Sequence, residues 1–290
     1  MHSDLIMKIE NAFTVDVEDY FQVEALKNNI NFNDWENFEC RVEKNTDLIL
    51  KLLDDNNIKG TFFVLGWIAK RYPGVVKTIA AQGHEVASHG MTHQLVYNQD
   101  KEVFRQETRD SKLLLQDLAQ QEIMGYRAAT YSITKKSLWA LDILNELGFR
   151  YDSSIFPMRH DKYGISDAHS EPHVMSTPSG KEIVEFPISV VKSRWVNFPV
   201  AGGGYFRIFP YFYTRWGLSS INAKKIPFVF YLHPWEVDPG QPHVNGLPAL
   251  SRFRHYTNLH TCYSKLEKLL ENFEFTTMQS VLKNLDLLKN

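Results

Sequence analysis

Cysteine is scarce in this chain of 290 residues. Cys40 and Cys262 are too few for a disulfide framework, and they lack the CxxC spacing of a structural zinc site. An excess of charge of either sign is also missing, because 32 Lys and Arg against 34 Asp and Glu give a net charge of −2. This balance predicts neither nucleic acid nor an anionic membrane as a partner.

Long apolar runs are absent as well. The longest strand-like one, residues 227–232, falls far short of the roughly 20 residues that cross a bilayer, so no transmembrane segment is predicted. The first ten residues, MHSDLIMKIE, lack the apolar region and the cleavage site of a secretory signal. We therefore expect a cytoplasmic protein, with a peripheral contact to the inner membrane left open.

Short apolar runs alternate with longer segments of helical period, which is typical of parallel βαβ units. Gly83 and Gly148 stand where left-handed caps would end two of the helices. About seven strands favour an α/β fold of the distorted (β/α)7-barrel type, with one further helix from Leu250, a short strand and a last helix. The predicted strands are 11–18, 61–65, 85–89, 122–127, 149–153, 183–189 and 227–233, and the predicted helices are 46–55, 74–82, 100–120 and 134–147.

Two segments interrupt the alternation. Residues 155–182 have no periodicity, and a loop of this length in a compact domain is usually functional, so we expect it to cover a site. Residues 190–206 end in three consecutive glycines that allow close backbone approach. We expect an N-terminal segment (1–10), one barrel domain (11–245) with long strand-end loops, and a helical extension (246–290) packed on the same domain.

Ligands of parallel α/β domains bind at the carboxyl ends of the strands. The first predicted strand ends in three carboxylates, Asp16, Glu18 and Asp19, whose repulsion requires a cation, a metal or exposure to water. Alternation places Asp16 and Glu18 on one face, and Asp19 joins them only if the strand has ended. A solvated loop rim is the alternative for an acidic triplet alone.

Other strands end in residues that could complete such a site. His89 and His93 have HxxxH spacing, and if the chain turns helical after His89 both rings can reach one cation. Two histidines with a carboxylate leave coordination positions open for water and substrate. Arg127 would pair with a carboxylate and lower its pKa, or form a rim salt bridge. His233 follows the last barrel strand, where a structural histidine is the common alternative.

Six stretches together carry more information than any one of them: TVDVEDYF (14–21), GTFFVLG (60–66), HEVASHGMTH (84–93), GYR (125–127), YDSSIFP (151–157) and LHPW (232–235). In these stretches the sequence resembles carbohydrate esterase family 4, the polysaccharide deacetylases with a NodB-type domain. Within that family it is most similar to the exosortase-associated group linked to bacterial exopolysaccharide synthesis. The segment RHYTN (254–258) also looks like the appended region of this group.

The resemblance implies that His89 and His93 bind one divalent metal ion, zinc in the first place, with cobalt, nickel or iron also compatible. In the family's commonest motif the metal carboxylate directly follows the catalytic base, but here Val17 occupies that position. A relative with a one-residue gap and the strand alternation both favour Glu18 as the carboxylate ligand. Asp19 is the alternative.

The resemblance also assigns the catalytic groups. Asp16 would be the general base and Arg127 would hold it, while His233 would be the general acid beside Leu232, which would line an acetyl pocket. The usual Arg-x-Pro-Tyr motif is altered, because Ala and Thr130 replace its Pro and Tyr. The backbone N–H of Thr130 could still stabilise an oxyanion, since that role needs no particular side chain.

Aromatic residues near the strand ends are candidates for stacking on sugar rings, although core packing is the alternative for at least half of them. They are Tyr20, Tyr131, Trp195, Tyr205 and Trp235.

The resemblance therefore implies a hydrolase that removes N-acetyl groups from amino sugars of a bacterial polysaccharide or its precursor, with an N-acetylated glycan as substrate and the exopolysaccharide synthesis machinery as a partner. An allantoinase-like hydrolase of a small cyclic amide is the second interpretation. A non-catalytic glycan-binding subunit is the third, but such a subunit should lack the base, the acid or a ligand, and every one of those positions is filled here.

Overall fold

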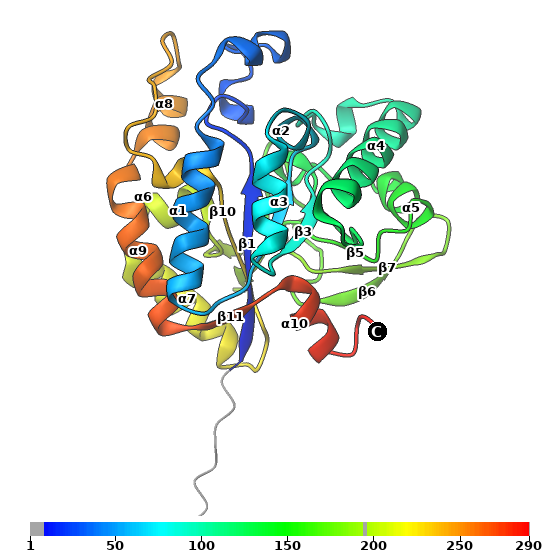
Figure 1. Cartoon of the computed structure of the whole chain (residues 1–290). Helices are drawn as coiled ribbons and strands as arrows, with labels where there is room; N and C mark the ends of the chain where they lie inside the picture. The colour runs from blue at the N-terminus through cyan, green and yellow to red at the C-terminus, as the bar shows by residue number, and fades with distance from the viewer. Residues whose placement is uncertain (1–8, 194–195, 290) are drawn as a thin grey trace, which may run out of the picture.

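A mostly parallel β-sheet forms the centre of the protein, and β1 lies between β10 and β2 near one end of the strand order (Figure 1). The computed structural model describes residues 9–193 and 196–289. β10, β2 and β11 all pair with β1 in parallel, and β6 (His173–Ser176) pairs antiparallel with β7 at the sheet edge. The parallel strands are β1 (Glu10–Val17), β2 (Thr61–Val64), β3 (Glu85–Ser88), β4 (Gly125–Tyr126), β5 (Tyr151–Asp152), β7 (Glu182–Glu185), β10 (Val229–Leu232) and β11 (Glu274–Thr276).

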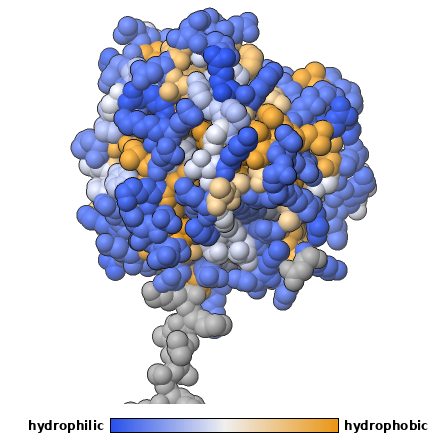
Figure 2. Space-filling view, in the orientation of Figure 1, coloured by the Kyte–Doolittle hydropathy of each residue, from blue (hydrophilic) through white to orange (hydrophobic). Residues whose placement is uncertain are grey.

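Helices cover the sheet, with α1, α7 and α9 on one flank and α4 and α5 on the other (Figure 1). Polar side chains dominate the outer surface of this face, and apolar side chains show in the gaps between the helices (Figure 2). No helix in the described ranges has the length and apolar character needed to cross a membrane. The helices are α1 (Val42–Asp55), α2 (Gly66–Arg71), α3 (Pro73–Ala81), α4 (Lys101–Ala119), α5 (Trp139–Glu146), α6 (Gly203–Ile208), α7 (Tyr211–Asn222), α8 (Ala249–Tyr256), α9 (Leu259–Asn272) and α10 (Met278–Asn284).

Local sequence explains where these helices begin and end. The Asp100 side chain accepts a hydrogen bond from the Glu102 backbone N–H and so caps the first turn of α4. One stripe of α4, which includes Phe104 and Leu115, is buried against the sheet. Gly83 and Gly148 have φ of +78° and +75° directly after α3 and α5, so the predicted left-handed glycine positions are confirmed.

The pleat of β1 sorts its side chains into two environments. Phe13, Val15 and Val17 pack outward in the cluster that contains the apolar faces of α1, α3 and α4. Ala12 belongs to the inner cluster, and Thr14 and Asp16 share its face because successive side chains alternate. The inner side of β1 therefore leads directly to Asp16 at the carboxyl end of the strand.

The (β/α)7 barrel predicted from the sequence is not confirmed in detail. The strand order is β10-β1-β2-β3-β4-β5-β7-β6, and among the described residues no ladder joins the two ends of this path. The ends approach through single contacts instead: the Ser189 hydroxyl accepts from the Val229 N–H at 2.9 Å, and Gly202 forms an isolated bridge to Tyr231. A separate hairpin, β8 (Val190–Val191) with β9 (Phe198–Pro199), stands between β7 and β10 in the chain.

The seven predicted strands all occur, but the single helix predicted from Leu250 is wrong. The chain leaves α8 after Tyr256, and Asn258 has φ of +58° before α9 begins. The Asn258 side chain donates to the Arg207 carbonyl at 3.0 Å, which fixes this break. After α9, β11 pairs with β1, and α10 packs on the same strand.

Candidate active site and metal centre

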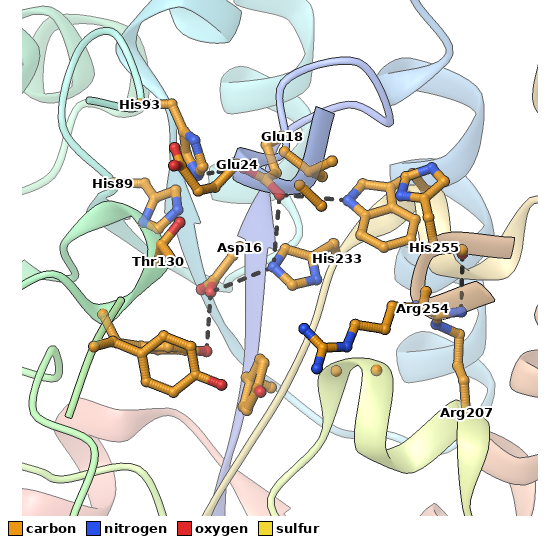
Figure 3. Close-up of a pocket in the computed structure, with 18 residues that line it drawn as sticks. Asp16, Glu18, Glu24, His89, His93, Thr130, Arg207, His233, Arg254 and His255 are labelled. Carbon is orange, nitrogen blue, oxygen red and sulfur yellow. Dashed lines mark hydrogen bonds and ion pairs between the residues drawn. The ribbon is translucent and has the colours of Figure 1, made fainter. Parts of the chain in front are cut away.

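A cavity of about 240 Å³ opens at the carboxyl ends of β1, β3, β4 and β10. Its wall contains eight of the residues predicted from the sequence, brought from four separate parts of the chain (Figure 3). They are Asp16, Glu18, His89, His93, Thr130, Tyr131, His233 and Trp235.

Glu18, His89 and His93 form the group in this cavity that could hold a metal ion. Each offers one ligand atom, and the three atoms lie within 4.8 Å of one another. His93 Nε2 is 2.6 Å from Glu18 Oε2, and both side chains are almost fully buried. The segment after His89 is irregular rather than helical, with φ of +76° at Gly90 and +55° at His93, and it still brings both rings to the same place.

The chemistry of these donors suits a cation. His89 Nδ1 lies 2.8 Å from the Arg127 carbonyl. Because a carbonyl oxygen only accepts hydrogen bonds, the proton of the neutral ring is on Nδ1, and the lone pair of Nε2 is available to a metal ion. Burial lowers the pKa of His89 to about 4, so the ring is neutral at pH 7. Burial raises the pKa of Glu18, but the neighbouring His93, His233 and His89 outweigh it and bring the pKa to about 2. Glu18 Oε2 is buried without a hydrogen bond of good geometry, and coordination to a metal ion would satisfy this oxygen instead.

Asp19, the predicted alternative ligand, does not reach this site. Its carboxylate is buried and accepts hydrogen bonds from the backbone N–H groups of Tyr20 and Arg41. Burial raises its pKa, against the hydrogen bonds that stabilise the charged form. Because these local bonds turn the side chain away, Asp19 does not line the cavity, and the choice between the two carboxylates falls to Glu18.

Asp16 is held by a fully buried arginine. Arg127 Nη1 donates to Asp16 Oδ1 at 2.6 Å and to the Thr14 hydroxyl at 2.8 Å. Its other guanidinium nitrogens donate to the carbonyl and the hydroxyl of Ser153, so the arginine is fixed on both sides. The Tyr131 hydroxyl lies 3.5 Å from Asp16 Oδ2. This arrangement orients the carboxylate and keeps Oδ2 on the cavity side.

His233, the residue directly after β10, faces the same carboxylates. Its Nε2 is 4.0 Å from Asp16 Oδ2 and 3.6 Å from Glu18 Oε1. Its Nδ1 lies 2.7 Å from Glu236, which in turn accepts from the Arg207 guanidinium at 2.6 Å. Burial lowers the pKa of His233, but the contact with Glu236 and the charges of Glu18 and Asp16 outweigh it and raise the pKa to about 9. The ring is therefore protonated at neutral pH.

Glu236 and Arg207 were not predicted from the sequence. Glu236 follows His233 by three residues, at the spacing of a capping box, and its side chain also accepts from the His233 backbone N–H. That spacing is a signal that sequence reasoning could have used. Arg207 has no such local signal, because its partners Glu236, His255 and Thr257 come from distant segments.

Thr130 lines the cavity in a backbone conformation that is rare for a β-branched residue. Its φ is +54°, and Tyr131 follows at +53°, within the 3-10 turn η4 (Ala129–Tyr131). Across residues 9–193 and 196–289, no hydrogen bond is made by the Thr130 backbone N–H. A strained turn with an unused N–H at a cavity wall is typical of functional sites.

Leu232, which was expected to line an acetyl pocket, does not line the cavity. It is 1% exposed and packs in the outer cluster, because it alternates with Tyr231 and His233, which face the cavity. Trp235 does line the cavity: its indole N–H points to Glu18 at 3.4 Å, and its ring stacks between His233 and His255.

The remaining aromatic candidates divide. Tyr131 lines the cavity, whereas Tyr20 is 1% exposed in the core. Tyr205 is not part of the cavity wall as described, and Trp195 lies outside the described residues. Instead, Tyr163 of the aperiodic segment 155–182 reaches the cavity, which agrees with the expectation that this loop covers a site.

Two family models together match most of the chain. Residues 29–151 match the polysaccharide deacetylase model, and residues 153–283 match a domain of unknown function, DUF3473. The two matches meet at the end of β5, in the middle of one continuous sheet. Asp16 precedes both matches, and His233 lies in the second.

Curated proteins similar to parts of this chain are also named as deacetylases. A chitooligosaccharide deacetylase of Rhizobium leguminosarum bv. trifolii is 31% identical over 116 residues, which are 40% of this chain and 49% of the relative. A peptidoglycan-N-acetylglucosamine deacetylase of Bacillus cereus is 34% identical over 74 residues, which are 26% of this chain and 27% of the relative. The matches thus span about half or less of the length of these relatives.

Solved structures share the fold. A protein of Mycobacterium smegmatis assigned to the polysaccharide deacetylases superposes with a TM-score of 0.64 at 19% identity, over 95% of this chain and 89% of that one. Puue allantoinase gives 0.60 at 16% identity, over 94% and 88%. At these identities the likeness concerns the fold alone. The family model and the curated relatives together support a polysaccharide deacetylase domain of the carbohydrate esterase family 4 (NodB) type in this chain.

Proposed function

We propose that this protein is a metal-dependent hydrolase that removes N-acetyl groups from amino sugars of a bacterial polysaccharide or its precursor and releases acetate. The observation that carries the proposal is the convergence of Asp16, Glu18, His89, His93 and His233 on one cavity. The relatives named for deacetylation of chitooligosaccharide and of peptidoglycan N-acetylglucosamine support the same class of substrate. The motifs favour the exosortase-associated group, and hence exopolysaccharide synthesis, as its setting.

Glu18, His89 and His93 would hold the metal, since three protein ligands leave positions open for water and substrate. When bound, a divalent ion supplies a Lewis acid that polarises the acetamide carbonyl and lowers the pKa of water. Zinc suits this mixed set of nitrogen and oxygen donors, and cobalt, nickel and iron are compatible with it.

Asp16 is placed to act as the general base. Arg127 donates to Asp16 Oδ1, whereas Oδ2, which lies 3.5 Å from the Tyr131 hydroxyl, faces the cavity and can accept a proton from a water molecule there. As that proton moves to Asp16, the water oxygen bonds to the acetamide carbon. The carbonyl oxygen then becomes negatively charged, and the unused Thr130 N–H at the cavity wall is proposed to donate to it.

His233 is placed to act as the general acid. Its Nδ1 is held by Glu236, so Nε2 points toward the carboxylates across the cavity. The protonated ring gives its Nε2 proton to the amide nitrogen as the carbon–nitrogen bond breaks. The products are acetate and a free amino sugar. The site returns to its starting state when Asp16 releases its proton to solvent and His233 takes up a proton from solvent.

The proposal is tested by measuring acetate released from an N-acetylglucosamine tetramer and, in parallel, hydrolysis of allantoin. We expect acetate release from the tetramer, its loss on metal removal, and its restoration by zinc. Asp16→Asn should reduce turnover by roughly 10²- to 10⁴-fold, the usual contribution of a general base. The matched control is Asp47→Asn, which changes an exposed aspartate on α1 and should leave turnover unchanged.

Turnover of allantoin without acetate release from the tetramer would favour the small-amide hydrolase. Binding of the tetramer with no hydrolysis of either substrate would favour a glycan-binding subunit. Loss of metal from the Asp16→Asn protein would mean that the base and ligand roles are exchanged.

A further inference from the structure

The wall of the cavity opposite His89 and His93 is built from α6 and from α8, the first helix of the C-terminal extension. Gly203, Arg207 and Arg254 line the cavity on this side. Arg254 reaches from α8 into the cavity, beyond His233 as seen from the proposed metal ligands (Figure 3). A substrate with its acetyl group at Glu18 and His93 would therefore extend toward this arginine.

The two arginines of this wall have different surroundings. The Arg207 guanidinium is buried, pairs with Glu236, and donates to the carbonyls of Arg254, His255 and Thr257. The Arg254 side chain is exposed, and within the described part of the chain its guanidinium forms no ion pair and no hydrogen bond. Its backbone is nevertheless fixed, because its carbonyl accepts from Arg207 at 2.9 Å.

The acidic side chains of the cavity are already paired. Asp16 pairs with Arg127 at 2.6 Å, and Glu18 lies 2.6 Å from His93. Glu24 pairs with Lys162 at 3.1 Å and with Lys27 at 3.7 Å. Arg254 is thus an uncompensated, permanently charged group in a cavity that leads to the proposed acetyl site.

The wall that faces Arg254 comes from the segment 155–182. Tyr163 lines the cavity, and its ring stacks on the His160 ring with the centroids 3.8 Å apart. Burial has the largest influence on the pKa of both residues, and the charge of Arg254 lowers both pKa values. A sugar chain leaving the site would pass between an aromatic ring pair and a guanidinium. Guanidinium groups bind carboxylate and phosphate oxygens in a two-pronged geometry that a neutral hydroxyl does not match.

We propose that Arg254 forms a subsite for an anionic group, a carboxylate or a phosphate, carried by the glycan next to the sugar that loses its acetyl group. This inference rests on the proposed function and makes it more specific: the preferred substrate is an acidic glycan or a phosphate-linked precursor rather than a neutral chitin-like chain.

The test compares three substrates: a neutral N-acetylglucosamine tetrasaccharide, an acidic tetrasaccharide of alternating N-acetylglucosamine and glucuronic acid, and UDP-N-acetylglucosamine. The second and third distinguish a carboxylate from a phosphate. The readouts are the ratio of kcat/KM for each anionic substrate to that for the neutral one, and the Kd of each by calorimetry, which needs no turnover.

We expect the wild-type protein to prefer one of the anionic substrates, and Arg254→Ala to lower that preference by roughly 10- to 100-fold, the range for a lost hydrogen bond to a charged group. Arg254→Lys should retain part of the preference, since it keeps the charge without the fork. Arg252→Ala, which removes an exposed arginine on the same helix outside the cavity wall, should retain all of it.

Equal binding of neutral and anionic ligands by the wild-type protein overturns the subsite, as does an equal loss of preference in the Arg252 and Arg254 variants. Binding of an anionic ligand that depends on Arg254, without acetate release from any of the three substrates, would instead support the subsite and contradict the proposed hydrolysis.

Discussion

At the residue scale, Glu18 and Asp19 are neighbours in the chain, but their carboxylates lie in different environments. Glu18 points into the cavity toward His93, with one oxygen that lacks a hydrogen bond of good geometry. Asp19 points back into the loop and binds the N–H groups of Tyr20 and Arg41. One carboxylate is thus suited to hold a metal ion, and the other holds the loop that follows β1.

This difference predicts opposite results for two matched variants. Glu18→Gln should lose the metal, because an amide oxygen is a weaker ligand than a carboxylate, with little loss of stability. Asp19→Asn should keep about one ion per chain but lose about 2 kcal/mol of unfolding free energy, because its amide nitrogen cannot accept one of the two backbone hydrogen bonds. Metal analysis and urea unfolding of both proteins check the prediction, and metal loss in Asp19→Asn alone would reverse the assignment.

Glu236 provides a second prediction at this scale. Its contact with Nδ1 raises the pKa of His233, so removing the carboxylate should lower that pKa. In Glu236→Gln the His233 ring should then lose its proton at a lower pH than in the wild-type protein. The alkaline limb of the pH–rate profile should therefore move toward neutral pH. A uniform fall in kcat with an unchanged profile would show that Glu236 has only a structural role.

The residue types of the site could be predicted from the sequence better than their surroundings. Asp16, His89, His93 and His233 stand at strand ends, where parallel strands bring side chains together. Arg254 could not be placed, because its approach to the cavity depends on the break between α8 and α9. The orientation of Leu232 depends on the pleat phase of a short strand, which a single sequence does not fix.

At the scale of elements, β5 and β7 are joined by a buried acid pair. Burial and the charge of Asp152 raise the pKa of Glu185 well above its ordinary value, and burial raises that of Asp152 to about 6. Above the ordinary pKa of a glutamate, Glu185 is therefore still protonated in the folded protein but ionised in the unfolded chain. The contribution of Glu185 to the free energy of unfolding consequently falls as the pH rises.

Glu185→Gln, which imitates the neutral acid, should remove that dependence. Relative to wild type, the unfolding free energy of the variant should rise by up to about 1.4 kcal/mol per pH unit between about pH 5 and pH 7. Urea unfolding at pH 5, 6 and 7 measures the difference. A difference that stays constant with pH would mean that Glu185 is ionised in the folded protein.

The parallel strands and the helices α1, α3, α4 and α5 could be predicted from the spacing of apolar residues and from the glycines after two of the helices, which are local signals. Barrel closure does not, because it depends on contacts between distant segments such as Ser189 with Val229. The end of α8 is also set by a distant partner, since Arg207 binds the carbonyls of residues 254, 255 and 257. A local pattern contains neither interaction.

At the scale of the whole molecule, residues 246–290 are built into the domain. β11 pairs with β1 at Glu10–Ala12, and the Met278 N–H donates to the Thr61 hydroxyl on β2. Met278, Val281 and Leu282 of α10 are buried in the inner cluster. We therefore keep the proposal that this extension packs on the same domain as the barrel.

A chain shortened to residues 1–245 should consequently fail to fold cooperatively. It would expose the apolar surface now covered by α9 and α10, and it would leave the buried Arg207 guanidinium without its three carbonyl partners. Circular dichroism and urea unfolding of the shortened chain provide the check. Cooperative unfolding at the urea concentration of the full chain would show that the extension is an independent unit.

The central claim is that distant parts of the chain meet around one cation. Its most direct test is an anomalous diffraction map of crystals grown with zinc. We predict one peak in the cavity, about 2.0–2.2 Å from Glu18, His89 and His93, with Asp16 and His233 beside it and Asp19 turned away. A map without a peak at these three side chains, or with a zinc ion bound by Asp19 instead, would contradict the account.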